Sequence, residues 1–558
     1  MRRLIFFFLF VPLAFPQQQI QVQRTQGEGQ DAAKKEKAPD PADVKRAKKL
    51  LSTAEAESGS FEPASRSYLC FQTARGYLKF DRPAARELLL RCFTASKEID
   101  PKDDFKHQIQ GWIVKELLQF GPETAQVLLP QVEGEAKSMV RAALIKDYTH
   151  KKDFDHAIAM VNEVRAGEED FPYAETGHLM LVLPEERSGD KRNLFSQALT
   201  DYRQRPSDFG RMSAEDMGTF VVRFALDVPP AMALEAIDEV LKHAQPDDKA
   251  KKSPQIVISS DGGSAAFRSK YELRLFQVLP ALQALDPSRA ESLLKDNQQA
   301  KELLARYPQG FQSLAPRYSN QPPPEKKEGE DTRSRMRVMM GDEGDAREQG
   351  TTEELRRGLD KRSEDIVKDA EKNPRQAIAQ AVSLPPSQPP MGEDFRLNTL
   401  DGIAQALLKK NPQFARAAVD EMLKILEGIQ SEEMKIYLAN AARHLIDLGE
   451  KDAAGKAIAQ GMAWGKKLHE KDENASDPNQ AIRPFWPSAD CWRSFTTLAR
   501  RISSDSALEA IKSIDDPEIV VFEKINLANA LLGLPTGMRI TREKRKSGQD
   551  NWSMDTDD

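Results

Sequence analysis

A short helix-start motif recurs along this 558-residue chain and constrains its fold more than any other feature. A residue suited to the N-cap position of a helix is followed four positions later by alanine, and in four copies proline comes directly after the cap. Asp, Asn, Ser and Gly suit the N-cap, and proline suits the first helical position, where no backbone N–H is needed. Alanine one turn into the helix lets a neighbouring helix come close. The copies with proline begin at Gly121, Asp286, Asn373 and Asn411, and those without it at Asp81, Asp153, Asp227, Gly449 and Ser503.

This repetition predicts an all-α protein of stacked antiparallel helical hairpins, an α-solenoid. The starts at 373, 411 and 449 are 38 residues apart, a period typical of two-helix repeat units. One segment, Gln255–Phe267, departs from the helical pattern. Its alternating apolar residues and the turn signal Asp261–Gly262–Gly263 predict a short β-hairpin or an ordered loop between helices.

Composition divides the chain into two helical blocks, 61–318 and 351–535, where apolar residues recur at helical spacing. Between them, 319–350 combines prolines, glycines and mixed charge, and it is expected to be a disordered linker. In front of the first block, 16–60 is expected to be disordered apart from a short helix over Ala42–Ser58. Residues 536–558 are expected to form a disordered charged tail, first basic and then acidic.

The N-terminus has the features of a signal peptide, assigned to residues 1–15. Arg2 and Arg3 precede the apolar run Leu4–Phe15, which is too short to cross a bilayer of roughly 30 Å as a helix. The sequence therefore predicts an exported protein, periplasmic or extracellular. No later apolar run reaches membrane length, so no stable membrane span is expected after signal cleavage.

Charge and cysteine content restrict the function further. The chain has 81 Lys and Arg against 87 Asp and Glu, a balance that disfavours a dedicated nucleic-acid binder. Cys70 and Cys92 lie at equal distances in sequence from Asp81, the expected turn of a hairpin, so antiparallel helices would place them at similar height. Two interpretations stay open: a disulfide, or two small buried thiols.

The segment Lys151–Val161, K-K-D-F-D-H-A-I-A-M-V, resembles the second-helix entry of a tetratricopeptide-like repeat. Gly121–Leu129 and Ser503–Ile511 resemble it more loosely. The usual Trp, Gly and Tyr framework of the first helices is missing, and helical repeats of the HEAT or armadillo kind are equally compatible. Such families imply a binding or assembly surface, usually for proteins, but the resemblance transfers no ligand-contacting residue to this chain.

The sequence contains none of the common catalytic or cofactor-binding motifs. It lacks H-E-x-x-H, G-x-S-x-G, a Walker loop and a dinucleotide-binding fingerprint, so no catalytic residue, metal site or cofactor is predicted. Two carboxylate pairs, Glu432–Glu433 and Asp515–Asp516, lie near expected helix starts, where the helix dipole favours acidic residues.

The best candidate for partner recognition is the aromatic segment Ile482–Phe495. Exposed aromatic side chains framed by arginines would suit a protein-binding hot spot. In the other interpretation, which the sequence favours, Trp486 caps the solenoid core and Trp492 begins a buried helix. The candidate residues are Arg483, Phe485, Trp486, Trp492 and Arg493.

These observations together predict an exported helical-repeat protein that acts as a protein–protein interaction scaffold, with a partner that the sequence does not identify. Two rival functions remain: an exported α-toroid enzyme acting on polysaccharide or peptidoglycan, and a structural envelope component without a discrete ligand. Two inward-facing carboxylates roughly 5–10 Å apart in an aromatic-lined cleft would distinguish the enzyme.

Overall fold

The computed structural model describes residues 40–165, 170–204, 216–244, 255–260, 263–314, 337–341, 346–386, 394–429, 434–474, 482–534, 538–544 and 550–556. In these residues α-helices dominate, from α1 to α24, and the all-α class is confirmed. The signal-like segment 1–15 and the rest of the chain up to residue 39 lie outside the described residues.

The first block comprises α1 to α15, with strands β1 and β2 inserted after α11. Its helices are α1 (Pro41–Ser58), α2 (Pro63–Tyr77), α3 (Arg82–Ser96), α4 (Asp104–Leu117), α5 (Pro122–Leu128), α6 (Gly134–His150), α7 (Phe154–Asn162), α8 (Tyr173–Val182), α9 (Ser188–Gln204), α10 (Met217–Phe224), α11 (Pro230–His243), α12 (Lys270–Leu285), α13 (Pro287–Asp296), α14 (Gln298–Arg306) and α15 (Phe311–Leu314).

The second block comprises α16 to α24. Its helices are α16 (Ala346–Asp369), α17 (Pro374–Val382), α18 (Phe395–Leu407), α19 (Pro412–Leu426), α20 (Met434–Asp447), α21 (Lys451–Asn474), α22 (Pro487–Ile502), α23 (Ser504–Lys512) and α24 (Pro517–Leu531), with the 3₁₀ turn η5 (Arg483–Phe485) before α22.

Seven of the nine expected helix starts are confirmed, and in each of them the motif alanine is buried. Because alanine has no side chain beyond Cβ, these positions let the first turn of one helix pack closely on its neighbour. The buried alanines are Ala85, Ala125, Ala157, Ala290, Ala377, Ala415 and Ala507.

The other two expected starts are wrong by a few residues. Helix α11 begins at Pro230 after Pro229, not after Asp227, and it buries Ala233. Helix α21 begins at Lys451 because Gly449 adopts a left-handed φ of 81°, which ends the preceding turn, and the buried residue is Ala454.

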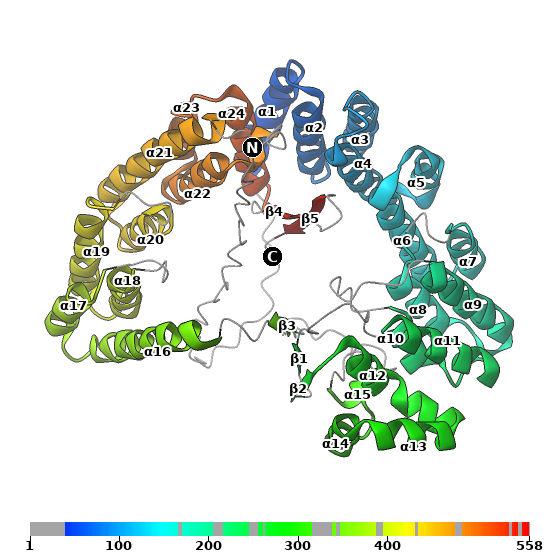
Figure 1. Ribbon diagram of the computed structural model, residues 1–558. Coiled ribbons are helices and arrows are strands. Elements are labelled where there is room, and N and C mark those ends of the chain that lie inside the picture. Colours follow the sequence, from blue (N-terminus) through cyan, green and yellow to red (C-terminus); the bar gives the residue numbers. More distant parts are fainter. Residues whose placement is uncertain are drawn as a thin grey trace, which may run out of the picture.

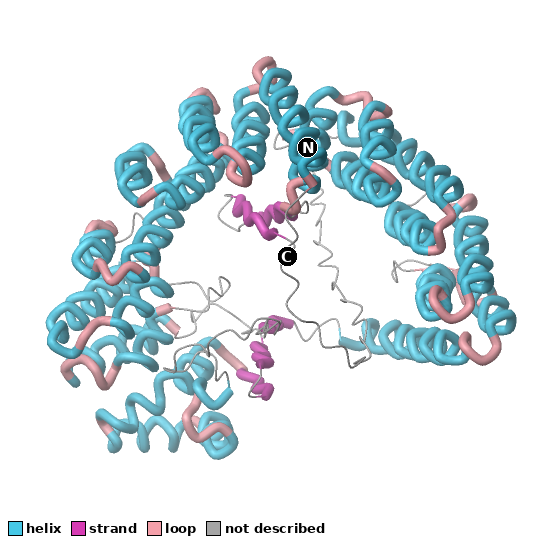
Figure 2. Tube along the Cα trace, turned by 180° about the vertical axis from the view of Figure 1, so that it is seen from behind, coloured by secondary structure: helices cyan, strands magenta, loops and turns pink. Residues whose placement is uncertain are grey.

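The hairpins follow one another around an arch that returns on itself, so that the last helix, α24, packs against the first, α1 (Figures 1 and 2). In this arch α4, α6, α8 and α10 line the inside of the first block, and α18, α20 and α22 line the inside of the second (Figure 1). The outer row includes α3, α5, α7 and α9 on one side and α19 and α21 on the other (Figure 1). One hydrophobic core runs through both blocks, from Ala47 in α1 to Leu532 after α24.

The predicted hairpin near 255–267 is confirmed as β1 (Gln255–Ser260) and β2 (Gly263–Phe267), which pair antiparallel. A third strand, β3 (Arg337–Gly341), pairs with the other edge of β1. The expectation that 319–350 is wholly disordered is therefore wrong, since β3 and the start of α16 fall within it. The sheet packs on α12 in a second, smaller core that includes Ile256, Phe267 and Phe276.

The helix expected over Ala42–Ser58 is confirmed as α1, which belongs to the folded arch and buries Ala47, Leu51 and Ala54. The expectation that the tail is wholly disordered is wrong. The tail forms an antiparallel hairpin of β4 (Met538–Lys544) and β5 (Asp550–Thr556), which lies inside the arch and contacts α4 (Figure 1). Its register pairs Arg539 with Asp555 and Lys544 with Asp550.

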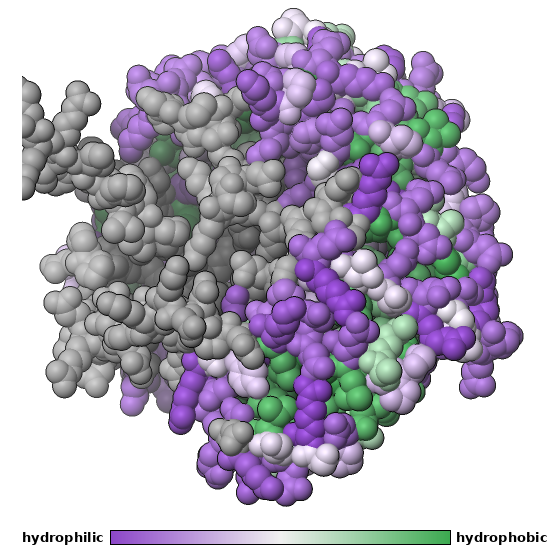
Figure 3. Space-filling model, turned by 45° about the vertical axis from the view of Figure 1, so that its right-hand side comes forward, coloured by the Kyte–Doolittle hydropathy of each residue, from purple (hydrophilic) through white to green (hydrophobic). Residues whose placement is uncertain are grey.

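The outer helices of the first block present a mainly hydrophilic face, with hydrophobic side chains in narrow patches between polar ones (Figure 3). Among the described residues, no helix is both long and apolar enough to span a bilayer.

Candidate functional site

The seam between the two chain ends is the most elaborate side-chain cluster in the described structure. We use "seam" for the contact of α1 and α2 with α24 and of α2 with η5. At its centre Tyr68 of α2 is only 1% exposed. Its ring lies 4.8 Å from that of Phe485 in η5 and 5.8 Å from that of Phe522 in α24. Burial of large aromatic rings on both sides makes the seam a part of the core and not a surface contact.

Polar contacts extend the seam beyond this aromatic centre. Lys524 of α24 bonds to Glu57 of α1 at 2.7 Å. Arg46 of α1 pairs with Asp505 of α23, an exposed contact that contributes little to stability. Helices α1, α2 and α24 come so close at Gly76 that a Cβ there would meet Leu51 and Asn529.

A compact acid cluster lies at the start of α24. Asp516 caps the helix, accepting hydrogen bonds from the backbone N–H groups of Glu518 and Ile519 at 2.8 and 3.0 Å. The Arg483 guanidinium pairs with Asp516. Glu518 instead accepts a hydrogen bond from Ser65 of α2 and a second, at 3.2 Å, from the backbone N–H of Arg483. Burial raises the pKa of Glu518 to about 7, and nearby Asp516 adds to this while Ser65 and Arg483 oppose it.

A second cluster connects α20, α22 and α24. Asp490 bonds to Lys435 at 2.5 Å and to Arg493 at 2.6 Å. Burial alone would raise the pKa of Asp490, but these two cations lower it to about 2. Glu523, fully enclosed beside Arg493, is different: burial raises its pKa to about 7 despite the cation.

Hydrogen bonds to Glu523 oppose the effect of its burial. The Thr496 hydroxyl donates to Glu523 Oε2 at 2.6 Å, and it also lies 3.0 Å from the Arg493 carbonyl. The Thr496 and Asn526 hydrogen bonds lower the pKa of Glu523, but burial has the larger effect.

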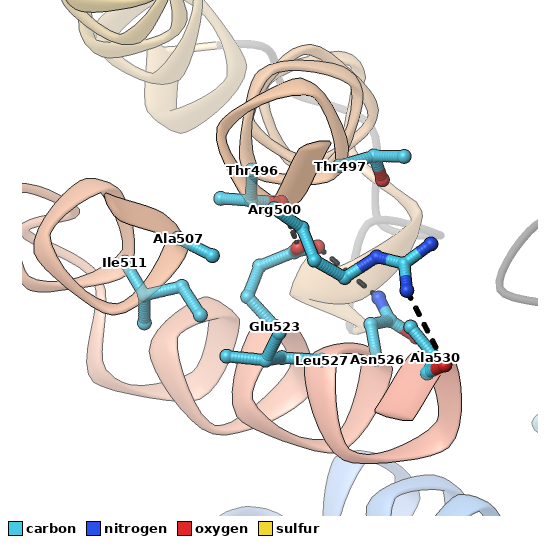
Figure 4. A pocket seen from close by; sticks show the side chains of 9 residues that line it. All are labelled: Thr496, Thr497, Arg500, Ala507, Ile511, Glu523, Asn526, Leu527 and Ala530. Atoms are coloured by element: carbon cyan, nitrogen blue, oxygen red, sulfur yellow. Dashed lines mark hydrogen bonds between the residues drawn. The ribbon is translucent and has the colours of Figure 1, made fainter. Parts of the chain in front are cut away.

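The cavity beside this cluster is very small. It lies between α22, α23 and α24, with Glu523 held between Thr496 and Asn526 while Arg500 reaches the Ala530 carbonyl (Figure 4). Its free volume of about 10 Å³ is close to the minimum for one water molecule. This space is too small for a sugar or a cofactor.

Of the five predicted partner-binding residues, the two tryptophans are buried, Phe485 and Arg493 are partly buried, and the Arg483 side chain is 41% exposed. Trp492 is 1% exposed and donates its Nε1–H to the Met462 carbonyl at 2.9 Å. Trp486 is 8% exposed and Phe485 packs on Tyr68. Arg483 and Arg493 are paired with carboxylates. An exposed aromatic hot spot does not fit this burial, and the buried-core interpretation does.

The two cysteines that flank Asp81 are joined in the structure. A disulfide connects Cys70 of α2 to Cys92 of α3, with the Cα atoms 5.6 Å apart. Cys491 is buried, and burial raises the pKa of its thiol to about 12, so it is a poor nucleophile.

Other candidate positions hold structural roles. Asp515 bonds to Lys466 at 2.6 Å, and Asp516 is the helix cap described above. Glu432 and Glu433 lie outside the described residues. Within the described part of the chain, no group of three or more His, Cys, Asp or Glu could hold a metal ion.

Sequence reasoning missed Ser65, Glu518, Glu523 and Asp490. The sequence did contain one signal for them. In some helices the apolar residues cover more than one face, so the polar residues between them are expected to be buried as well. In α2 and α24 ten of the fifteen residues are buried, whereas in α3 only six are.

A comparison with models of known protein families finds no match, and neither does a comparison with curated proteins.

Proposed function

We propose that this protein is an exported helical-repeat scaffold that binds a protein partner on the inner face of its arch. The observation that carries the proposal is the arrangement of the inner helices. Helices α4, α6, α8 and α10, and α18, α20 and α22 on the other side, succeed one another around a common interior (Figure 1). Curved stacks of helical hairpins use such extended concave surfaces to bind other proteins.

Export is supported by two independent features. The basic and apolar N-terminus has the composition of a signal peptide. The Cys70–Cys92 disulfide is a bond that forms and persists in oxidising compartments and is rare in the cytosol.

A partner-mapping experiment tests the scaffold proposal. A photo-crosslinking residue would replace the exposed Lys115 of α4 or Lys146 of α6 on inner helices, with the exposed Glu87 of α3 and Lys456 of α21 on outer helices as controls. We expect a discrete crosslinked protein in native cells from the inner-helix positions only. Equal crosslinking from both rows, or from neither, would contradict an inner binding face.

Export has its own test. Protein expressed with its native leader should leave the cytoplasm. The unreduced, denatured chain should then release one thiol, from Cys491, and the reduced chain three. A cytoplasmic pool that retains Met1 and three free thiols would refute export.

A further inference from the structure

We propose that Glu518 is a proton-dependent latch of the seam: while its carboxyl is protonated the two chain ends stay joined, and loss of the proton weakens their contact. This inference is independent of the scaffold proposal. It rests on where Glu518 lies and on what faces it.

Glu518 belongs to the second block, but its carboxyl is held by groups from elsewhere. Ser65, which donates to it, lies in α2 of the first block, 453 residues away in sequence. The Arg483 N–H comes from η5, on the second block's side of the seam. The side chain is buried, so this carboxyl directly connects the first and last parts of the chain.

The cations near Glu518 would not neutralise its carboxyl if it were ionised in addition to Asp516. At the start of α24, Asp516 caps the helix and pairs with the Arg483 guanidinium. On α21, His469 lies 3.6 Å from Asp516 and 3.7 Å from Glu473, and Asp472 accepts the Ser488 N–H at 2.9 Å. From α2 only the neutral hydroxyl of Ser65 bonds to the carboxyl. Among the described side chains, no cation bonds to Glu518.

Ionisation of Glu518 would therefore place two carboxylates beside one shared arginine in a buried interface. A buried carboxylate without a bonded cation is disfavoured, and the hydrogen bonds from Ser65 and the Arg483 N–H offset only part of that cost, so the neutral acid is the form that fits the closed seam. The raised pKa of Glu518, about 7, agrees with this geometry. When the seam opens, the carboxyl reaches water and its pKa returns toward its ordinary value of 4.5. The closed seam then binds the proton more tightly than the open one, and closure weakens as the pH rises through about 7.

Hydrogen exchange of the full-length protein at pH 5.5 and pH 8, corrected for the intrinsic rate, tests the latch. Peptides from α1, α2 and α24 report the seam, and α12, in the separate sheet core, is the internal reference. When the pH is raised from 5.5 to 8, we expect protection of the wild-type seam peptides to fall roughly 30-fold more than protection of α12. The reason is that the pKa of Glu518 is higher in the closed seam than in the open one.

Two variants sharpen the experiment. Glu518→Gln keeps the shape and hydrogen bonding of the neutral acid, so the fall in protection of its seam should be much smaller than in the wild type. Any fall that remains comes from Glu523, which lies on α24 and also has a raised pKa. Glu509→Gln, on the exposed face of the neighbouring α23, should behave as wild type. A wild-type seam that follows α12 at both pH values overturns the latch even without a variant. A fall of equal size in the wild type and in Glu518→Gln also overturns it.

Discussion

The two blocks meet in two places that are built in different ways. At the seam, residues more than 450 positions apart share one continuous core, with Ser65 bonded to Glu518 and Lys524 to Glu57. At the other junction the chain itself passes from one block to the next, and there β3 pairs with β1 over a smaller, separate core. No helix-to-helix packing comparable to the seam joins the blocks there within the described residues.

This difference shows that covalent connection and structural continuity need not coincide. The order of hairpins runs through the seam, where α24 and α1 pack together as two helices of one hairpin do. The N-terminal and C-terminal helices thus complete a single repeat layer between them. The seam consequently joins the two blocks more closely than the linker-like composition between them implies.

The largest expected effect comes from breaking the seam core with Phe522→Ala. Phe522 is buried against Tyr68, and such a truncation typically costs about 3–5 kcal/mol. Phe276→Ala, in the sheet core, is the matched control because Phe276 is also buried beside an aromatic ring, Phe267.

A protease site inserted within 342–345, after β3, converts this comparison into a separation assay, because β3 then stays with the half that contains β1. After cleavage, the two halves of the wild-type chain and of Phe276→Ala should co-elute in size-exclusion chromatography, because the seam holds them together. The halves of Phe522→Ala should separate. Separation of the wild-type halves would show that the junction at the linker, and not the seam, joins the blocks.

The disulfide near the seam should have the next largest effect. Cys70 and Cys92 close a short loop between α2 and α3, and Cys92→Ser should cost about 2–4 kcal/mol of unfolding free energy. A reductant should lower the urea midpoint of the wild type to that of Cys92→Ser and should leave the variant unchanged. If reductant shifts both proteins equally, the disulfide does not carry the effect.

Glu523 should make the second block less stable as the pH rises. Its pKa is about 7 in the folded chain against an ordinary value of 4.5, so its stabilising contribution is complete below about pH 4.5 and is lost as the pH rises through about 7. The change is on the order of 2–3 kcal/mol. Glu523→Gln should therefore reduce the fall in unfolding free energy between pH 5 and pH 8 by about that amount, leaving the part that Glu518 contributes, while Glu509→Gln should retain the whole fall. Identical slopes in the two variants would mean that Glu523 is ionised in the folded protein.

Much of the outer architecture follows from local chemistry, and most of the site does not. Helix starts such as those after Asp81 and Asp286 depend on a cap and a first turn, which lie within five residues of sequence. The seam depends on α1 meeting α24, and no local pattern encodes a contact across the whole chain. Glu518 and Glu523 have the sequence appearance of ordinary polar helix residues, because their burial is created only by that contact.

The smallest expected effect separates two copies of the helix-start motif that look equivalent in sequence. Asn411 was expected to cap α19 through its side chain, but it makes no side-chain cap hydrogen bond there, although its carbonyl accepts from Ala415. Asp286, in contrast, accepts a hydrogen bond from the Arg289 N–H at 3.1 Å.

Asp286→Ala should therefore cost about 0.5–2 kcal/mol, whereas Asn411→Ala should cost no more than a few tenths. A change at the motif alanine of the same helix should have a larger effect than the change at Asn411. Ala415 is fully buried, so Ala415→Leu should cost about 1–3 kcal/mol by overpacking. Urea unfolding of the full-length variants measures all three changes. If Asn411→Ala proves as costly as Asp286→Ala, the N-cap side chain acts in both helices. If Ala415→Leu leaves the midpoint unmoved, close helix packing is not why alanine recurs one turn after each cap.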